Sequence, residues 1–325
     1  QELMDALVIN YKTTTVLTYG EARDTFMRNI DAVDNQLECV YTGFKVTLDP
    51  SLDPTTDAFS QGINTEHSYP RSKGASEGTN AYSDMHHLFP TRERANSDRG
   101  SLILSEVTDS QTDKWYFEDN IITNIPSTNR DAYSELLTNE GFEPREKHKG
   151  DVARAYFYFY TMYQSQADNA APNFFELQRE TMCDWHFMDS VDEKEWNRNL
   201  QIATYQDDKV NPFILDCRLA RLYCGDIEGY CITVSTEEQE DEKLTYFPNP
   251  VRSELYIAHN AVNRYTTYQI YNYIGESVKR ADFDTSTSTG SLSAINVSDL
   301  DAGIYILHLL SKSSSEVTMA KFIKL

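Results

Sequence analysis

Basic side chains are scarce in this chain, and that shortage limits what its surface can bind. The 325 residues include 29 Lys and Arg against 51 Asp and Glu, a net charge of −22 at pH 7. From Tyr246 onward seven basic side chains balance seven acidic ones, so the whole negative excess lies before that residue. A field of that sign repels polyphosphates. The sequence therefore argues against a broad basic binding face, and any nucleic-acid binding must depend on a local site with a bound cation.

Long apolar runs are also missing from the sequence. The longest hydrophobic stretches, such as 304–310, have the length of a β-strand, whereas a transmembrane helix needs about 20 consecutive apolar residues. Hydrophobic residues make up 40% of the chain and charged residues 25%, which is typical of a protein that folds in water. We therefore expect no membrane span, and a chain long enough for one large domain and a smaller one.

Cysteines are few and are not paired along the sequence. The chain contains five: Cys39, Cys183, Cys217, Cys224 and Cys231. No Cys-x-x-Cys pair occurs, which argues against a zinc ribbon or a thioredoxin-type site. Cys224 and Cys231 enclose two glycines, where the chain can turn back, so a local disulfide is one interpretation and two small buried hydrophobic side chains are the other. The odd number leaves at least one thiol free or shared between chains.

The first part of the chain has the pattern of a mixed α and β domain. Apolar spacing predicts helices at 19–30 and 151–163, while alternating β-branched and aromatic residues predict a strand at 39–48. A capping box at 190–193 predicts the start of a further helix, which the Asn-Pro pair at 211–212 ends.

A change in composition near residue 240 divides the chain. Residues 235–245 are acidic and poor in apolar side chains, as in an extended linker. Beyond them, turn-forming segments separate short strand-like runs at 254–258, 267–273, 303–310 and 317–323. Several short strands in one small segment predict a β-sandwich. We therefore divide the chain into a catalytic domain at 1–234, a linker at 235–245 and a β-domain at 246–325.

The residues best suited to chemistry lie between 64 and 100. They form Asn-Thr-Glu-His-Ser-Tyr-Pro at 64–70, Ser-Asp-Met-His-His-Leu-Phe-Pro at 83–90 and Arg-Ala-Asn-Ser-Asp-Arg-Gly at 94–100. A histidine suits a general base at neutral pH, and glutamate and asparagine oxygens suit Mg²⁺. On a regular strand Glu66 and His67 would point to opposite faces. They can share a site only if the strand ends or distorts there, which the nearby proline permits.

These motifs, in this order, resemble the bacterial endonuclease I family, one of the ββα-metal or His-Me finger nucleases. The resemblance continues through 150–158 and 211–213 and covers roughly residues 1–225. It implies an α+β fold: a ββα-metal nuclease domain with surrounding helices, followed here by the small all-β sandwich. It also implies a secreted endonuclease that hydrolyses phosphodiester bonds of DNA, and of RNA as a further candidate, with little sequence preference. The implied cofactor is a divalent metal, Mg²⁺ first, with Ca²⁺ or Mn²⁺ as alternatives.

The resemblance also assigns roles to residues within the motifs. His67 would be the general base that activates water. Glu66 and Asn96 would bind the metal, with waters and a phosphate oxygen completing its shell. Arg99, about one helical turn beyond Asn96, would contact the phosphate. Four more residues are implied in supporting roles, namely Arg71 and Arg94 at the substrate phosphate and Asp84 and His86 in bracing the motif.

Two positions depart from the family's pattern. Some members carry a longer insertion after the histidine motif, and the arginine that it supplies has no clear counterpart in this chain. Arg71 or Arg99 is the candidate to replace it. The family's Arg-Gly-Asn is Arg-Gly-Ser here, ending at Ser101.

Two other functions stay open for the first part of the chain. One is a zinc hydrolase that uses His67, His86 and His87. The other is a surface adhesion or binding protein on a degenerate nuclease fold. The presence of Glu66, His67 and Asn96 together favours the nuclease.

The C-terminal part carries a resemblance of its own. Tyr-Phe-Pro-Asn-Pro at 246–250, Asp-Ala-Gly-Ile-Tyr at 301–305 and Lys-Phe-Ile-Lys at 321–324 are similar to the C-terminal sorting domain of type IX secretion. This implies the secretion machinery as a partner, and a secreted or cell-surface location in a Gram-negative bacterium. A surface adhesion or carbohydrate-binding module is the alternative. We expect the protein to be a monomer.

Overall fold

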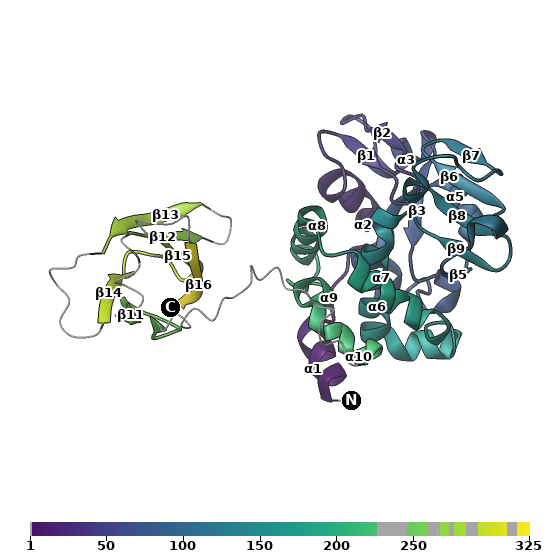
Figure 1. Cartoon of the computed structure of the whole chain (residues 1–325). Helices are drawn as coiled ribbons and strands as arrows, with labels where there is room; N and C mark the ends of the chain where they lie inside the picture. Colours follow the sequence, from purple (N-terminus) through teal and green to yellow (C-terminus); the bar gives the residue numbers. More distant parts are fainter. Residues whose placement is uncertain are drawn as a thin grey trace. The chain divides into compact units, whose positions relative to one another are not determined.

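The chain folds into two compact units, Gln1–Thr233 and Val234–Leu325, each of which has its own core (Figure 1). The computed structural model describes residues 2–225, 246–258, 265, 267–272, 276–283, 292–310 and 317–325. Helices and strands are mixed in the first unit and the second is all β, so the predicted α+β class is confirmed. The predicted linker at 235–245 and Cys231 lie outside the described residues.

Helices are more abundant than strands in the first unit. They are α1 (Glu2–Tyr11), α2 (Tyr19–Thr25), α3 (Pro54–Ser60), α4 (Asn80–Ser83), α5 (Glu93–Arg99), α6 (Lys149–Ala170), α7 (Arg179–Met188), α8 (Glu193–Ala203), α9 (Pro212–Leu215) and α10 (Arg221–Cys224). The predicted helix at 19–30 is present as α2 followed by a π-helical turn at Phe26–Ile30.

The central helix of this unit is α6, which contains the predicted helix at 151–163 and is longer. Sequence spacing predicts one broad apolar face for this helix. In the structure every residue from 152 to 159 is buried, so the helix is covered on all sides over that length. A helix that is covered on all sides belongs to the middle of a domain. Helix α7 packs alongside α6, as Figure 1 shows.

The strands of the first unit form three small sheets. They are β1 (Gln36–Glu38), β2 (Lys45–Thr47), β3 (Ile63–His67), β4 (Leu88–Arg92), β5 (Ile103–Leu104), β6 (Lys114–Phe117), β7 (Asn120–Ile122), β8 (Ser134–Leu137) and β9 (Gly141–Glu143). β1 pairs with β2, β3 pairs with β4, and the others form a sheet in the order β5-β9-β8-β6-β7. Since α5 begins directly after β4, the chain forms a strand–strand–helix unit from Ile63 to Arg99.

The single strand predicted at 39–48 was wrong. The segment turns between β1 and β2, which pair with each other in an antiparallel register. Gly43 makes the turn possible with a φ of +74°, and a Cβ there would lie 2.7 Å from the Arg145 guanidinium. Alternating side chains gave no sign of this left-handed residue.

The helix predicted from the capping box at 190–193 also needs correction at both ends. Asp192, rather than Ser190, caps α8 by accepting the Glu195 backbone N–H at 2.8 Å. The helix ends at Ala203, and Asn211 caps the next helix, α9, instead of ending this one.

A disulfide joins α7 to α10 and differs from the local interpretation. Cys224 bonds to Cys183 with an S–S distance of 2.05 Å, across 41 positions of sequence. The prediction that an odd thiol stays unpaired is confirmed, because Cys39 is free and buried. The Cys39 Sγ accepts the backbone N–H groups of Arg92 at 2.9 Å and Thr42 at 3.3 Å.

The second unit is the predicted sandwich of two sheets. Its strands are β10 (Tyr246–Phe247), β11 (Glu254–Ala258), β12 (Thr267–Asn272), β13 (Ser277–Asp282), β14 (Leu292–Asn296), β15 (Gly303–Leu310) and β16 (Val317–Lys324). One sheet has the order β10-β11-β14 and the other β13-β12-β15-β16. The four predicted runs are β11, β12, β15 and β16, whereas β10, β13 and β14 were not predicted. In the part of the chain that the structure describes, no helix has the length and apolar character that crossing a membrane requires.

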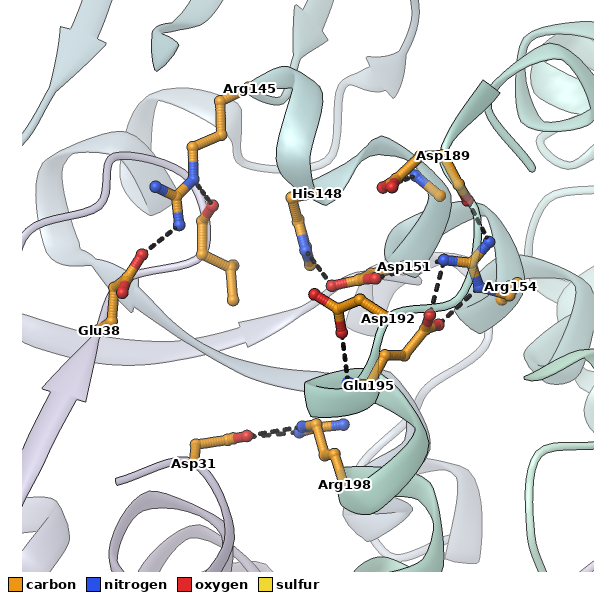
Figure 2. A network of polar contacts seen from close by, with 12 residues as sticks. Asp31, Glu38, Arg145, His148, Asp151, Arg154, Asp189, Asp192, Glu195 and Arg198 are labelled. Atoms are coloured by element: carbon orange, nitrogen blue, oxygen red, sulfur yellow. Dashed lines mark hydrogen bonds and ion pairs between the residues drawn. The ribbon is translucent and has the colours of Figure 1, made fainter. Parts of the chain in front are cut away.

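A buried charge network fixes the first turn of α6 against α8 (Figure 2). Arg154 binds both carboxylate oxygens of Glu195, with Nε–Oε1 at 2.6 Å and Nη2–Oε2 at 2.7 Å. Arg154 also donates to the Asp189 carbonyl at 2.7 Å, and Asp189 Oδ2 accepts the Gly150 N–H at 3.0 Å. Asp151 lies beside Arg154 and accepts from His148 at 3.4 Å. Two carboxylates, those of Asp151 and Glu195, therefore pair with one arginine, and the Asp189 carboxylate lies beside them.

Because these carboxylates lie close together, we expect the stability of the fold to depend on pH through the Asp189 carboxyl. Burial and the Asp151 carboxylate raise the pKa of Asp189 to about 6. The folded chain thus holds a proton that the unfolded chain releases, and the stabilisation that this proton gives is lost as the pH rises through about 6. We expect Asp189→Asn, whose amide oxygen still accepts the Gly150 N–H, to gain melting temperature relative to the wild type between pH 5 and pH 8. Asp184→Asn, on the exposed side of α7, is the control. A difference that stays constant with pH would contradict the assignment.

Candidate active site

The strand–strand–helix unit of β3, β4 and α5 gathers most of the site residues predicted from the sequence. In the β3–β4 pair His67 lies opposite Leu88 and Glu66 opposite Phe89. Strand β3 ends at His67, so the condition that the sequence set for Glu66 and His67 to act together is met. Both side chains are buried, at 2% and 6% exposure.

His67 is held in one orientation and one protonation state. Its Nε2 lies 3.0 Å from the Tyr82 carbonyl oxygen. Because a carbonyl only accepts hydrogen bonds, Nε2 must carry the proton and Nδ1 is left with the lone pair. Burial lowers the pKa of His67 to about 3. The ring is therefore neutral at neutral pH, with the Nδ1 lone pair that a general base uses, while the same burial weakens its affinity for a proton.

Two tyrosine rings enclose His67. The Tyr82 ring stacks on it with centroids 5.1 Å apart, and the Tyr19 ring lies 5.4 Å away. His87 packs on it as well, at 5.5 Å. These contacts leave the imidazole little rotational freedom.

Glu66 is ion-paired below the surface. Its Oε1 accepts the Tyr41 hydroxyl at 2.6 Å and lies 2.9 Å from Arg99 Nη1. Burial raises the pKa of Glu66, while the Arg99 charge and the Tyr41 hydrogen bond oppose that rise. Both contacts use Oε1, so Oε2 is the oxygen that can reach a ligand.

Arg99 lies deeper than a phosphate contact requires. It has 0% exposure. Its guanidinium donates to the Ser68 carbonyl at 2.7 Å, to the Tyr156 hydroxyl at 2.9 Å and to the His67 carbonyl at 3.2 Å, besides pairing with Glu66. These bonds engage the guanidinium within the protein. In this structure Arg99 therefore orients Glu66 and the end of β3 from below the surface.

Asn96 is oriented by the same strand. Its Nδ2 donates to the Thr65 carbonyl at 3.0 Å, next to Glu66 in β3. The amide is thereby fixed so that Oδ1 points away from the strand. A glutamate oxygen and an asparagine oxygen are thus offered by one strand and the helix that packs on it.

Asp84 and His86 lie behind the site, in the core. The Asp84 carboxylate is fully buried and accepts from the Tyr158 and Tyr163 hydroxyls at 2.9 and 2.8 Å and from Gln206 at 2.9 Å. Burial raises the pKa of this carboxyl, but the neighbouring histidines and hydrogen bonds outweigh it and leave the pKa lowered. His86 Nε2 lies 3.0 Å from the Lys209 carbonyl.

The two arginines predicted at the phosphate are both at the surface. The Arg71 side chain is 55% exposed, and its guanidinium lies 4.9 Å above the Tyr82 ring. A long contact of 3.5 Å joins it to exposed Glu77. Arg94 is exposed on the first turn of α5.

The zinc alternative is not supported. His86 and His87 are bound to backbone carbonyls of Lys209 and Ala81 and lie in the core. Among the residues that the structure describes, no group of three or more His, Cys, Asp or Glu side chains is placed to hold a metal ion. A site built from one carboxylate, one amide, waters and substrate oxygens is a different kind of site and is compatible with this geometry.

Sequence reasoning missed the tyrosines that order the site. Tyr41 binds Glu66, Tyr156 binds Arg99, and the Tyr82 carbonyl sets the tautomer of His67. Tyr41 and Tyr156 both lie in segments that carried the resemblance. Nothing in their spacing showed that their hydroxyls reach the same ion pair.

The chain as a whole can now be compared with known proteins. The family model described as Endonuclease I matches residues 4–217, a span that contains the strand–strand–helix unit and all the residues above. The chain therefore belongs to the endonuclease I family. The model described as a secretion system C-terminal sorting domain matches residues 245–324.

Two curated relatives are similar to part of the chain. An extracellular ribonuclease of Bacillus amyloliquefaciens is 30% identical over 168 residues, which are 46% of this chain and 50% of that protein. An extracellular ribonuclease of Bacillus subtilis (strain 168) is 28% identical over 166 residues, with the same coverage. The chain spans about half the length of the curated relatives it matches.

Proposed function

We propose that this protein is a secreted endonuclease that hydrolyses phosphodiester bonds of DNA and RNA with the help of a divalent metal. The observation that carries the proposal is the geometry of His67, whose ring is fixed with Nε2 on the Tyr82 carbonyl and the lone pair left on Nδ1, next to Glu66 on the same strand. Membership of the endonuclease I family supports the reaction class. The names of the two extracellular ribonucleases support RNA beside DNA as a substrate.

The chemistry of the donor atoms fits a hard cation. Glu66 Oε2 and Asn96 Oδ1 would hold it, and hard oxygen ligands are those that Mg²⁺ prefers, with Ca²⁺ and Mn²⁺ as alternatives. When bound, such an ion stabilises negative charge on the phosphate and on the leaving 3′-oxygen. His67 Nδ1 takes the proton of the water that attacks phosphorus, and the Tyr82 carbonyl holds Nε2–H in place as the ring becomes charged. Arg99 keeps Glu66 ionised and oriented.

The decisive assay uses two substrates and a chelator. The full chain is incubated with plasmid DNA and with single-stranded RNA, each with and without EDTA. We expect cleavage of both without EDTA and of neither with it. Binding without cleavage would favour the alternative of a binding protein on a degenerate nuclease fold.

The metal ligands make a separate prediction. Asn96→Ala removes one oxygen donor while leaving His67 in place, so half-maximal activity should require more Mg²⁺. Ser97→Ala, an exposed neighbour on α5, serves as the control. The measurement is the initial rate of plasmid cleavage as a function of Mg²⁺ concentration. Identical titrations for Asn96→Ala and the wild type would remove Asn96 from the ligand set.

Sequence preference should be low. Phosphate contacts carry no base information, and the exposed arginines near the site are few. Two further arginines of the strand–strand–helix unit, Arg92 and Arg99, are paired with Asp119 and Glu66. We therefore propose that substrate is held by the metal and a few local cations, and cut at nearly random positions.

The C-terminal unit is proposed to act in export. Its match to a secretion sorting domain supports recognition by the secretion machinery and a secreted or cell-surface location. Since the two units have separate cores, a chain that ends near residue 235 should fold and cleave plasmid at the rate of the full chain. Purified samples of both lengths are compared at equal concentration. Loss of soluble protein or of activity in the shorter chain would show that catalysis needs the second unit.

A further inference from the structure

A series of four stacked side chains lies beside His67 and is not used in the mechanism above. The Arg23 guanidinium carbon lies 4.6 Å from the Tyr19 ring centre, and the Arg71 guanidinium carbon 4.9 Å from the Tyr82 ring centre. The Tyr19 and Tyr82 rings are in turn 4.3 Å apart. We call these four residues the Arg–Tyr stack.

The stack is fixed by local structure. Tyr19 and Arg23 are four residues apart on α2, so their side chains occupy one face of the helix. A capping box between Thr18 and Glu21 fixes the start of that helix. Tyr82 belongs to α4 and holds His67 by its carbonyl. Because both tyrosine rings also pack on the His67 ring, the stack is continuous with the candidate active site.

Arg23 differs from most arginines of this acidic unit. Other arginines lie within ion-pair distance of carboxylates, among them Arg92, Arg99, Arg130, Arg145, Arg154 and Arg198. Arg23 has no carboxylate within that distance among the residues that the structure describes, and its Nε is buried without a hydrogen-bond partner. The side chain is only half-buried, so its terminal nitrogens can still receive a ligand.

Such an arginine is suited to a phosphate. A guanidinium presents several donors in a plane that match phosphate oxygens. Stacking on an aromatic face attracts the cation and limits its motion, so less entropy is lost when an anion binds. Arg23 lies on the Tyr19 ring, which in turn packs on His67, so one ring separates its charge from the imidazole.

We propose that Arg23, supported by Tyr19, is a second phosphate-binding subsite for a nucleic-acid strand whose adjacent phosphodiester lies at His67. This inference rests on the proposed function for its substrate class. Arg23 is a positioning residue here, because it holds the strand and does not touch the reacting atoms. Arg71 on Tyr82 would bind the same strand from the other end of the stack.

The test measures binding separately from cleavage. All variants are made in the full chain carrying His67→Gln, which keeps most of the side-chain volume against the two tyrosines. Dissociation constants are measured with Mg²⁺ over a range of NaCl concentrations, for a DNA duplex and for a single-stranded RNA of equal length. Adding Arg23→Gln should weaken binding about tenfold, as loss of one charged hydrogen-bonding contact does. The slope of log affinity against log salt should fall by about 0.9 for duplex and about 0.7 for single strands.

Two matched comparisons make the result specific. Arg221→Gln removes an exposed arginine of α10 and should leave both affinity and slope unchanged. Tyr19→Phe keeps the ring and should bind like the parent, whereas Tyr19→Leu removes it and should weaken binding as Arg23→Gln does. If Arg23→Gln does not fold, the Tyr19 pair carries the same test.

Equal affinity and equal salt slope for Arg23→Gln and its parent would overturn the subsite. Equal affinity of the Tyr19→Leu and Tyr19→Phe variants would overturn the supporting role of the ring. A wild type that binds these ligands without cutting them would instead overturn the proposed function, since the binding comparison does not depend on cleavage. A weakened RNA complex beside an unchanged DNA complex would support the subsite and assign it to RNA.

Discussion

Replacing His67 by alanine should lower the rate of plasmid cleavage by roughly 10² to 10⁴-fold, the usual contribution of general base catalysis. The fold should survive, because the ring lies at the end of β3 and its hydrogen bond is to a single carbonyl. The measurement is kcat at saturating Mg²⁺ and pH 7, with the melting temperature recorded for each protein. His308→Ala, the same substitution in the second unit, should keep full activity.

The protonation state of His67 defines the pH range over which this effect is expected. Burial lowers the pKa of the imidazole to about 3, so the ring needs no deprotonation before it acts at neutral pH. The loss in His67→Ala should therefore be present throughout the neutral range. A variant that retains the wild-type rate at pH 7 with an unchanged melting temperature would remove His67 from the mechanism.

Replacing Arg99 by methionine should have the largest effect on stability. The substitution leaves the Glu66 carboxylate buried without its cation, and breaking a buried ion pair from one side costs about 3–5 kcal/mol. It also removes the donors to the Ser68 and His67 carbonyls and to the Tyr156 hydroxyl. Urea denaturation of the wild type and the variant measures the difference in the free energy of unfolding.

Two comparisons separate the effect of losing the ion pair on stability from the effect of losing side-chain packing. The double variant Arg99→Met with Glu66→Gln should recover part of the lost stability, since no buried charge is then left alone. Arg218→Met breaks an ion pair with Asp216 that lies at the surface, and should cost far less stability than Arg99→Met because solvent screens both charges. If Arg99→Met lowers the free energy of unfolding as little as Arg218→Met does, Glu66 does not need the arginine charge.

The resemblance to the family implied the strand–strand–helix unit, because the motifs that carry it are local in the sequence. Glu66 and His67 are adjacent, Pro70 limits how far β3 can run, and Asn96 follows on a short helix. Sequence spacing could not determine how deeply each side chain is buried. Arg99 lies one turn beyond Asn96 and was expected at the phosphate, yet the helix turns it inward, where Glu66 and Tyr156 bind it.

The errors in the predicted fold also arise from contacts between residues that are far apart in the sequence. The glycines beside Cys224 suggested a bond to a near neighbour in sequence, but α7 brings Cys183 to it from 41 positions away. The helix at 151–163 was correctly placed, and its apolar face was underestimated because Arg154 and Thr161 are also buried. Arg154 is tolerated there because carboxylates from α6 and α8 neutralise it.

The burial of Cys39 affects how an exported chain avoids forming unwanted disulfides in an oxidising medium. Thiol–disulfide exchange needs an accessible thiolate, and Cys39 has 0% exposure. Its sulfur is further occupied by two backbone N–H groups, one of them from the strand that leads into α5. Once the β3–β4 hairpin has formed, the odd thiol is withdrawn from exchange, so oxidation outside the cell has no route through Cys39 to covalent dimers.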